Sequence, residues 1–542
     1  MTSVRLAILS SLLCTSILVT QPALAESDAV IAQQLQAMQE QIQKLQAQIK
    51  DMHKTIAGAN NAAKAATVKA DAAKAAALNP PAVNKTDAGA IADAAPLALA
   101  APAATGGLQN KNIKLTLGGF TEVTAIGRTH SESTDEGSGW TTAIPFPYLP
   151  ANHLSEFRES ARCSRLSLLA QGTVNANTDL TAYVETDFTG AAHTSNSTEA
   201  NGYVPKLRQA FVAMDRYDLG LHVLGGQAWS LITLNRIGII ARQENVPQTI
   251  DTGYIPGFNY TRNSQFRVVK DFDDNRVWAG ISLESPQAIV SNGPNNPTGG
   301  APIYTLAGGS GFDTTNSYTT DLAPDVVVKL AFDPGYGHYE VYGLGRFFRD
   351  RTHVGGTNDT IMGGGAGVGA ILPIIDKKLE FQVSGLAGRG IGRYGPAQLP
   401  DVTTRADGSL ATIGEIQALV GLNAHPTEKI DLYLYSGIEQ AQKNYSFNGA
   451  GASHAFGYGN PFYNNSGCDT EGAAATSCVA NTKSVEQIAV GGWYKFYKGS
   501  YGMMEIGASD SYTTRYTFSG INSIAPSVNE NVTMVSFRYY PF

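Results

Sequence analysis

Charged side chains recur on one face of segments whose other face is apolar. In residues 179–189, Leu180, Ala182 and Val184 alternate with Tyr183 and Glu185. A strand with this pattern has one face suited to lipid and one suited to water, and charges that line a narrow aqueous passage select the ions that enter it. Whether a residue shares the odd or even positions of the polar side chains in its strand, its parity, shows which face it lies on. Six charged residues are candidates to line such a passage: Arg165, Arg208, Arg276, Arg346, Glu185 and Asp187.

The parity assigns three of the four arginines directly. Arg165 shares a face with Ser167, opposite Leu166 and Leu168. Arg208 lies opposite Leu207, and Arg276 shares a face with Trp278 and Ser282. Arg346 stands in a segment that is Gly-rich on both faces, so its side is ambiguous. For each arginine, the alternative is an ion pair with a wall carboxylate that serves the fold instead of the passage.

A second group of charges lies in one long connection, residues 232–261. It contains Arg236, Arg242, Glu244 and Asp251. Opposing charges in a loop that folds into a passage would set a transverse field at its narrowest point. The alternative is a loop that caps the passage from outside.

No catalytic, metal or cofactor motif accompanies these charges. The nine histidines are scattered, and the sequence contains no H-E-x-x-H, no G-x-S-x-G and no metal-spaced cysteine cluster. We therefore expect that the protein is not an enzyme and that it has no cofactor and no metal site. The formal charge of −7 and the absence of a basic block argue against a nucleic-acid partner.

The charges need strands to position them, and composition favours strands. The chain has 57 glycines and 24 tyrosines among its 542 residues, and the alternation with period two begins at Ile113. Sixteen candidate strands follow: 113–129, 157–174, 179–189, 206–216, 219–231, 262–270, 275–285, 323–332, 338–350, 360–373, 377–393, 411–423, 430–441, 483–497, 500–518 and 529–542.

The connections between these segments alternate strictly between short turns and long loops. An even number of strands, short turns at one end and long loops at the other are typical of outer-membrane barrels. A soluble β-sandwich would not require this alternation. The chain also ends on an aromatic residue, Phe542, as terminal strands of such barrels do, although Arg538 then falls where an outward apolar residue is expected. We predict an all-β transmembrane barrel over residues 111–542.

Three segments precede the barrel. Residues 1–25 have a positive start, a short apolar run and the cleavage-site pattern Ala23-Leu24-Ala25, which predict a signal peptide. Residues 26–57 carry an apolar heptad seam from Ile31 to Ile56, which predicts an α-helical coiled coil that self-associates, without settling dimer against trimer. Residues 58–110, rich in Ala and Pro, predict a disordered linker. We expect no transmembrane helix after the signal.

Export places the cysteines in an oxidising compartment. Cys468 and Cys478 lie ten residues apart in a polar, Gly-rich segment, and we expect them to form a disulfide within one loop. The alternative is two free thiols. Cys163 is left single, and we expect it to be a small buried apolar residue.

The layout resembles the DcaP-like porin family. Three short segments carry the resemblance, and the third resembles the family's G-x-x-W-S run: Arg158–Leu166, Lys206–Val212 and Gly225–Ser230. The resemblance implies a trimeric sixteen-stranded channel with an N-terminal coiled coil, and anionic solutes such as dicarboxylates. By analogy with general porins, the third long loop, residues 232–261, would fold into the lumen.

These observations favour a channel for passive diffusion of small hydrophilic solutes in the bacterial outer membrane. Its expected partners are small solutes, outer-membrane lipid and further copies of the chain as a homotrimer, with the coiled coil in the periplasm. One alternative is a sugar or nutrient channel, in which Tyr433 and Tyr435 would face the lumen. Another is a structural tether or adhesin whose functional part is the coiled coil.

Overall fold

The computed structural model describes residues 108–110, 113–132, 134, 136, 142–190, 204–291, 293–295, 305–308, 313–319, 321–351, 357–479 and 481–542. The chain divides into two compact units, Met1–Asp93 and Ala94–Phe542, and all described residues belong to the second. The expected signal peptide and coiled coil lie outside the described residues. So does the expected linker, except for its last three residues, which form the short strand β1 (Leu108–Asn110). In the described part of the chain, no helix is long and apolar enough to cross a membrane.

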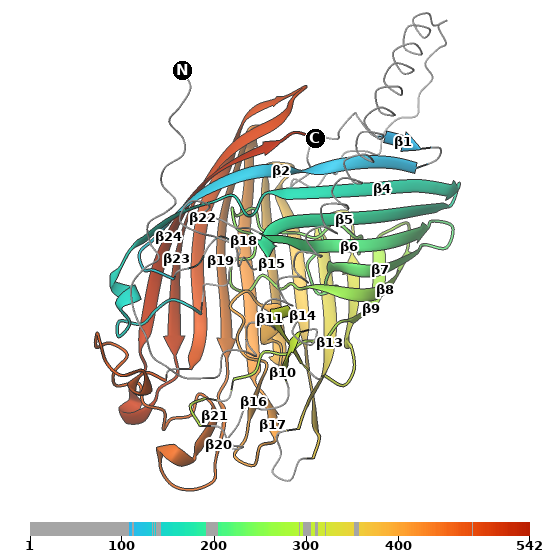
Figure 1. Cartoon of the computed structure of the whole chain (residues 1–542). Coiled ribbons are helices and arrows are strands. Elements are labelled where there is room, and N and C mark those ends of the chain that lie inside the picture. The colour runs from blue at the N-terminus through green and yellow to red at the C-terminus, as the bar shows by residue number, and fades with distance from the viewer. Residues whose placement is uncertain are drawn as a thin grey trace, which may run out of the picture. The chain divides into compact units, whose positions relative to one another are not determined.

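The second unit is a closed antiparallel barrel (Figure 1). Each barrel strand pairs with its neighbours in the sequence, and β24 pairs with β2 from Thr121↔Tyr539 to Arg128↔Val532, which closes the sheet. The barrel strands are β2 (Ile113–Arg128), β3 (Glu156–Ser160), β4 (Arg165–Asn175), β5 (Thr178–Gly190), β6 (Val204–Arg216), β7 (Leu221–Trp229), β8 (Arg262–Phe272), β9 (Val277–Glu284), β12 (Asp325–Phe332), β13 (His338–Asp350), β14 (Asp359–Ile375), β15 (Leu379–Arg389), β18 (Gly414–Thr427), β19 (Ile430–Ala441), β22 (Thr482–Gly499), β23 (Gly502–Thr517) and β24 (Ser527–Tyr540).

Strands β3 and β4 share one position in the wall. β3 pairs with the second half of β2 and β4 with its first half, so together they form one of sixteen barrel strands. The sequence predicts one strand over residues 157–174, and the structure interrupts it at residues 161–164, where the backbone N–H of Ser164 donates to the carbonyl of Ala161 (3.1 Å). The predicted sixteen-stranded barrel is confirmed.

The two faces of the wall differ as the alternation predicts. Outward side chains on β9, β12, β18 and β19 are apolar and exposed: Ile281, Leu283, Val328, Leu330, Ile416, Val420, Leu432 and Leu434. The inward face carries buried polar groups such as Ser282, Glu284 and Gln417. An apolar outer band around a polar interior is the pattern of barrels that face lipid.

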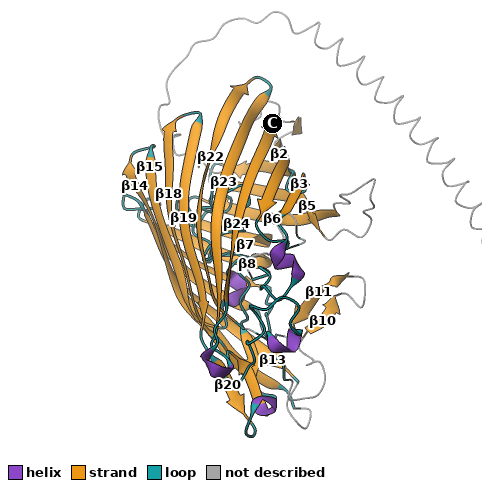
Figure 2. Cartoon of the chain, turned by 90° about the vertical axis from the view of Figure 1, so that its left-hand side faces the viewer, coloured by secondary structure: helices purple, strands orange, loops and turns teal. Residues whose placement is uncertain are grey.

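Seven short and eight long connections alternate around the barrel. The long loops gather at the end away from the C-terminus, as the teal and purple segments of Figure 2 show. Three loops contain small hairpins that the alternation did not predict: β10 (Thr305–Gly308) with β11 (Asp313–Thr319), β16 (Val402–Thr404) with β17 (Leu410–Thr412), and β20 (Asn444–Phe447) with β21 (Ala455–Tyr458). Short 3-10 helices lie in these and other long loops: η1 (Pro150–His153), η3 (Gly392–Tyr394), η4 (Ala452–His454), η5 (Ala475–Ser477) and η6 (Ile521–Ser523).

Candidate functional site

The loop between β7 and β8, residues 230–261, lies inside the barrel. The backbone N–H of Gln248 donates to the hydroxyl of Tyr435 on β19 (3.1 Å), and Nε1 of Trp493 on β22 donates to the carbonyl of Gln248 (2.8 Å). Farther round the wall, Arg538 on β24 donates to the carbonyl of Ile250 (2.8 Å). Bonds to three inner-wall strands place this loop across the lumen and not over its mouth. We refer to it as the constriction loop.

Apolar packing and close backbone contact hold the constriction loop in place. Ile250, Tyr254, Ile255 and Phe258 are buried among inward side chains of β18, β19, β22 and β24. Gly437 on β19 allows the closest approach, because a Cβ added there would lie 1.9 Å from the carbonyl oxygen of Pro256. The side chain of Glu439, two residues along the strand, accepts a hydrogen bond from the N–H of Gly257 (2.9 Å). The loop is therefore part of the packed interior.

A cavity of about 360 Å³ lies between the constriction loop, the wall strands β24, β2 and β4 to β8, and the loop that follows β15. Its lining combines five cationic side chains, two carboxylates and several aromatic rings. The lining residues are Phe120, Glu122, Cys163, Arg165, Thr189, Lys206, Arg208, Trp229, Ile250, Asp251, Thr252, Gly253, Tyr260, Arg262, Pro396, Gln398 and Arg538.

Two of the five cations are held by carboxylates. Arg208 donates to Glu185 (2.6 Å) and to Asp187 (2.5 Å), both on β5. The register between β5 and β6 shifts at this point, so Arg208 is the extra residue of a β-bulge, a feature that redirects a side chain. Arg538 pairs with Glu122 on β2 at 2.9 Å.

The other three cations are less neutralised. Arg165 lies 3.9 Å from Glu185, and neither Lys206 nor Arg262 has an ion pair among the described residues. Aromatic rings position two of these guanidinium groups: Arg165 lies over Phe120 (5.2 Å to the centroid) and Arg262 over Trp229 (5.3 Å). A ring attracts a cation without cancelling its charge. The cavity therefore presents positive charge to a solute.

Within its lining, the cavity has more cations than carboxylates. Against the five cations stand Glu122 and Asp251 in the lining, and Glu185 and Asp187 behind Arg208. The carboxylates of Glu122, Glu185 and Asp187 are almost fully buried, whereas Lys206 is exposed.

The structure places the six predicted wall residues in different surroundings. Arg165 and Arg208 line the cavity, and Glu185 and Asp187 lie inward as partners of Arg208. Arg346 also points inward, but it is sealed beneath the loop that follows β15, where it pairs with Asp325 (3.2 Å) and Asp401 (2.6 Å). Its role is therefore to fasten that loop to the wall.

Arg276 lies outside the cavity lining, in a turn. The predicted strand began at Asn275, but β9 begins at Val277, and Arg276 lies exposed in the short turn after β8. Its backbone N–H donates to Phe272 and Asp273, as turn residues do. Its shared parity with Trp278 does not place it on the inner face, because the alternation of faces applies only within the strand.

Of the four predicted charges in the constriction loop, only Asp251 lines the cavity. Arg236 pairs with Glu380 on β15 (2.7 Å), and Arg242 is exposed and lies over the ring of Tyr183 (4.8 Å). Glu244 is buried, and that burial raises the pKa of its carboxyl above the ordinary value. Three of the four charges therefore lie away from the cavity, and Asp251 faces it.

Sequence reasoning missed three of the five cavity cations: Lys206, Arg262 and Arg538. Lys206 shares the parity of Arg208, which is a signal that was available. Arg538 lies inward between the outward Phe537 and Tyr539, and stacks on Trp493 (4.2 Å). The expectation of an outward residue at 538 was wrong, because it took the register from the terminal Phe542 instead of from Val535 and Phe537.

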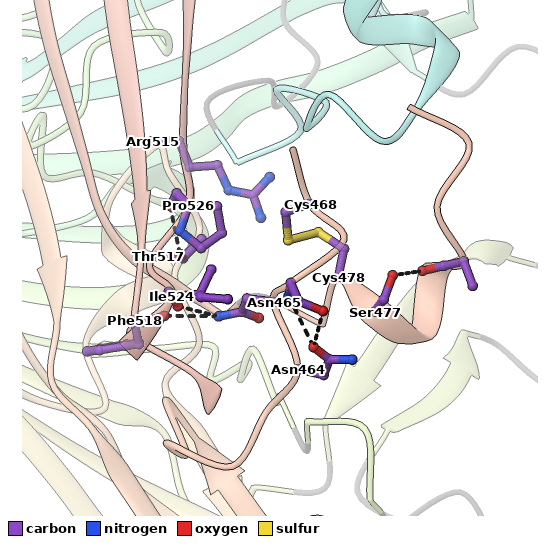
Figure 3. Close-up of a disulfide and its surroundings, with 12 residues drawn as sticks. Asn464, Asn465, Cys468, Ser477, Cys478, Arg515, Thr517, Phe518, Ile524 and Pro526 are labelled. Carbon is purple, nitrogen blue, oxygen red and sulfur yellow. Dashed lines mark hydrogen bonds between the residues drawn. A yellow bond between two sulfur atoms is a disulfide. The ribbon is translucent and has the colours of Figure 1, made fainter. Parts of the chain in front are cut away.

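The two loop cysteines form a disulfide in the structure, Cys468–Cys478 (Figure 3). Cys468 is buried against Ile144 and Phe146 of the first long loop. Cys163 is free and lies partly exposed in the cavity lining, so it is not the buried apolar residue that we expected. It is placed there by the interruption between β3 and β4.

The fold and the cavity together define a porin architecture, a closed barrel narrowed by an inward loop. No family model matches the sequence, and no curated protein matches it. Among solved structures, the outer membrane channel DcaP of Acinetobacter baumannii is similar at 15% identity and a TM-score of 0.55, over 80% of this chain and 99% of that one. An anion-selective porin from Comamonas acidovorans matches at 10% identity and a TM-score of 0.42, over 79% of this chain and 99% of that one. The likeness to DcaP confirms the resemblance at the level of the fold.

Proposed function

We propose that this protein is an outer-membrane porin for passive diffusion of small hydrophilic anions, such as carboxylates. One observation carries the proposal: Lys206 and Arg262 face the cavity with no carboxylate partner among the described residues. Charges at a constriction act at close range, whereas the net charge of −7 is spread over surfaces that salt screens within ~8–10 Å. The selectivity of the pore follows from its lining.

The size and chemistry of the cavity fit small solutes. A volume of about 360 Å³ holds a small organic acid with some water, and cations from β4, β6, β8 and β24 surround it. A solute with two carboxylates could contact cations on two sides at once, which would retain it longer than a monovalent anion. The A. baumannii protein of similar fold is an outer membrane channel, which agrees with transport.

The sugar-channel alternative loses its main support. Tyr433 and Tyr435 face inward as expected, but the constriction loop covers them, and Tyr435 bonds to Gln248 and Asn423. Rings hidden by a loop cannot form a track for a passing sugar. The rings that line the cavity are Phe120, Trp229 and Tyr260, and two of them hold arginines.

The remaining parts of the proposal concern the oligomeric state and the cellular location of the protein. We propose a homotrimer in the bacterial outer membrane, with the segment 26–57 as a periplasmic coiled coil. The apolar outer band of the barrel and the heptad seam support these statements.

Ion selectivity in a planar lipid bilayer tests the function. The purified full chain is inserted, and the reversal potential is measured in a KCl gradient. We expect anion selectivity, and current block by a small dicarboxylate that is stronger than block by the neutral diol of the same length. Cation selectivity of the wild type would overturn the anion proposal, and absence of conductance would overturn the porin itself.

A further inference from the structure

The charges around the cavity are divided between two of its sides. On the side formed by β6 and β8, Lys206, Arg208 and Arg262 line the cavity together. The charged groups that act on Lys206 include both of these arginines and Asp187, so three cations lie close to one another here. Glu185 and Asp187 pair with Arg208 only, and this side keeps an excess of positive charge.

Carboxylates gather on the side formed by β2, β24 and the constriction loop. Glu122 on β2 and Asp251 in the loop both line the cavity. Arg538 on β24 connects them, because it pairs with Glu122 (2.9 Å) and donates to the carbonyl of Ile250 (2.8 Å), the residue before Asp251. One arginine therefore stands beside two carboxylates.

A third acid adjoins these two. Glu136, in the first long loop, is fully buried. Burial raises the pKa of its carboxyl well above the ordinary value, and the nearby carboxylates of Glu122 and Asp251 raise it further, while Arg538 lowers it less. A cation placed among these acids would favour their ionised forms. This side of the cavity is therefore short of positive charge.

Both signs of charge include buried atoms that have no hydrogen-bond partner among the described residues. Glu122 is 2% exposed, and its Oε2 accepts no hydrogen bond from them. Among the cations, Nη1 of Arg262 and Nε of Arg165 donate none to them. Unmet buried donors and acceptors are costly, so a solute that supplies partners for both kinds of atom would be retained in the cavity.

We propose that the cavity preferentially retains small carboxylates that also carry an ammonium group, such as acidic amino acids. The carboxylates of the solute meet Arg165, Lys206 and Arg262. Its ammonium group meets Glu122 and Asp251. An ammonium group has three donors and no acceptor, which suits carboxylate oxygens, and hydrogen bonds between two charged groups are the strong ones. The inference rests on the proposed function and names the class of solute within it.

A cavity of uniform positive charge would rank solutes in another order. It would favour glutarate, with two negative charges, over glutamate, which has the same carbon chain and carboxylates but one net negative charge because of its ammonium group. The separated charges of this cavity reverse that order, because the ammonium group enters the region of the acids. The two solutes therefore distinguish the inference from anion selectivity alone.

Current block in planar bilayers tests this order. The purified full chain is inserted, and the concentration of each solute that halves the KCl current is measured at pH 7. We expect glutamate to block at a concentration about threefold lower than glutarate, which is the effect of one unit charge at ~6 Å in water. Equal block, or stronger block by glutarate, would overturn the inference.

Two variants of nearly unchanged shape test the acidic side. Asp251→Asn and Glu122→Gln remove a charge, but they keep an oxygen that can accept from Gly253 and from Arg538, respectively. In each variant we expect weaker block by glutamate and stronger block by glutarate, because a carboxylate that attracts ammonium and repels anions is gone. Glu428→Gln, in the exposed turn between β18 and β19, is the charge-matched control and should change neither. Weaker block by both solutes, or unchanged block, in both variants would contradict the inference.

The inference and the proposed function give different results when they fail. Only protein that migrates as a folded, heat-modifiable barrel is compared, so a variant that fails to fold does not count. An anion-selective wild type that glutarate blocks more strongly than glutamate sinks the ammonium-binding side alone. A cation-selective wild type sinks the anion channel and the inference with it.

Discussion

The guanidinium group of Arg262 lies over the indole ring of Trp229, 5.3 Å from its centroid, at the point where the constriction loop begins and ends. Trp229 is the last residue of β7 and Arg262 the first of β8, and the two pair across the ladder. The ring fixes the cation in place but leaves its charge available to a solute. The point where the loop leaves β7 and rejoins β8 is therefore a positively charged part of the pore.

Removing the charge at Arg262 should lower anion selectivity. In Arg262→Gln the cavity loses one of its two cations without a carboxylate partner. A unit charge ~6 Å from an ion changes its energy by roughly 0.7 kcal/mol even at the dielectric constant of water, which is about threefold in occupancy. We expect the reversal potential to fall by a corresponding amount. Arg276→Gln is the charge-matched control, because Arg276 is exposed in a turn, and an equal effect of both variants would contradict the assignment.

Replacing Arg165 and Arg208 together by alanine should change selectivity more strongly. Arg208 holds Glu185 and Asp187, so its loss uncovers two carboxylates beside the cavity. The pore should shift toward cations and lose block by a dicarboxylate. Leaving buried carboxylates unpaired costs roughly 3–5 kcal/mol, so the barrel should also unfold at lower temperature. Reversal potential and thermal unfolding measure the two effects, and unchanged selectivity would show that Glu185 and Asp187 do not reach the solute path.

The strands were predictable because the barrel imposes its pattern locally. Alternation with period two placed β13 and β19 with their observed bounds, and most other strand ends to within about two residues. The pore was harder to predict, because its residues gain their roles from partners far away in the sequence. Arg346 is sealed by Asp401, 55 residues later, and Arg538 meets Glu122 across the closure of the barrel.

Local irregularities account for the other differences. The bulge at Arg208 and the interruption at residues 161–164 both shift parity, and neither leaves a mark in a pattern of apolar and polar residues. Both irregularities adjoin the cavity, where they present Arg208, Cys163 and Arg165. Parity assigned Arg165 and Arg208 to the inner face, but it did not predict these two irregularities or the exposure of Cys163 in the lining.

Displacing the constriction loop should widen the pore. In Gly437→Val the new side chain would collide with the carbonyl of Pro256, which an added Cβ alone approaches to 1.9 Å. The loop must move off β19, and the bond from Gly257 to Glu439 should break. We expect a larger single-channel conductance and weaker anion selectivity. Gly343→Val, on the outward face, should leave both unchanged, and a normal conductance in Gly437→Val would contradict the loop's role.

The stability of the first long loop should depend on pH through Glu132. Burial and the neighbouring Glu530 carboxyl raise the pKa of Glu132 to about 9. The unfolded chain loses this proton near pH ~4.3, so between these values folding takes up a proton and the free energy of unfolding falls as pH rises. Glu132→Gln should be less sensitive to pH between 5 and 9 than the wild type. Protease cleavage within residues 129–155 measures this, and equal pH dependence in both proteins would refute it.

Breaking the disulfide should loosen the loop between β19 and β22 without changing the channel. Cys468 packs with Ile144 and Phe146, and Tyr148 donates its backbone N–H to the carbonyl of Cys468 (2.9 Å), so the bridge supports the contact between two outer loops. Neither cysteine lines the cavity. Disulfides of this kind contribute typically 2–4 kcal/mol. Cys468→Ser with Cys478→Ser should therefore speed proteolysis of residues 464–479 and leave conductance and reversal potential as in the wild type. Altered selectivity in the double variant would place this loop in the solute path.

Mass mapping of the wild-type protein without reductant tests the bridge itself. It should find one cross-linked peptide that contains both cysteines. Two alkylatable thiols at these positions would refute the disulfide.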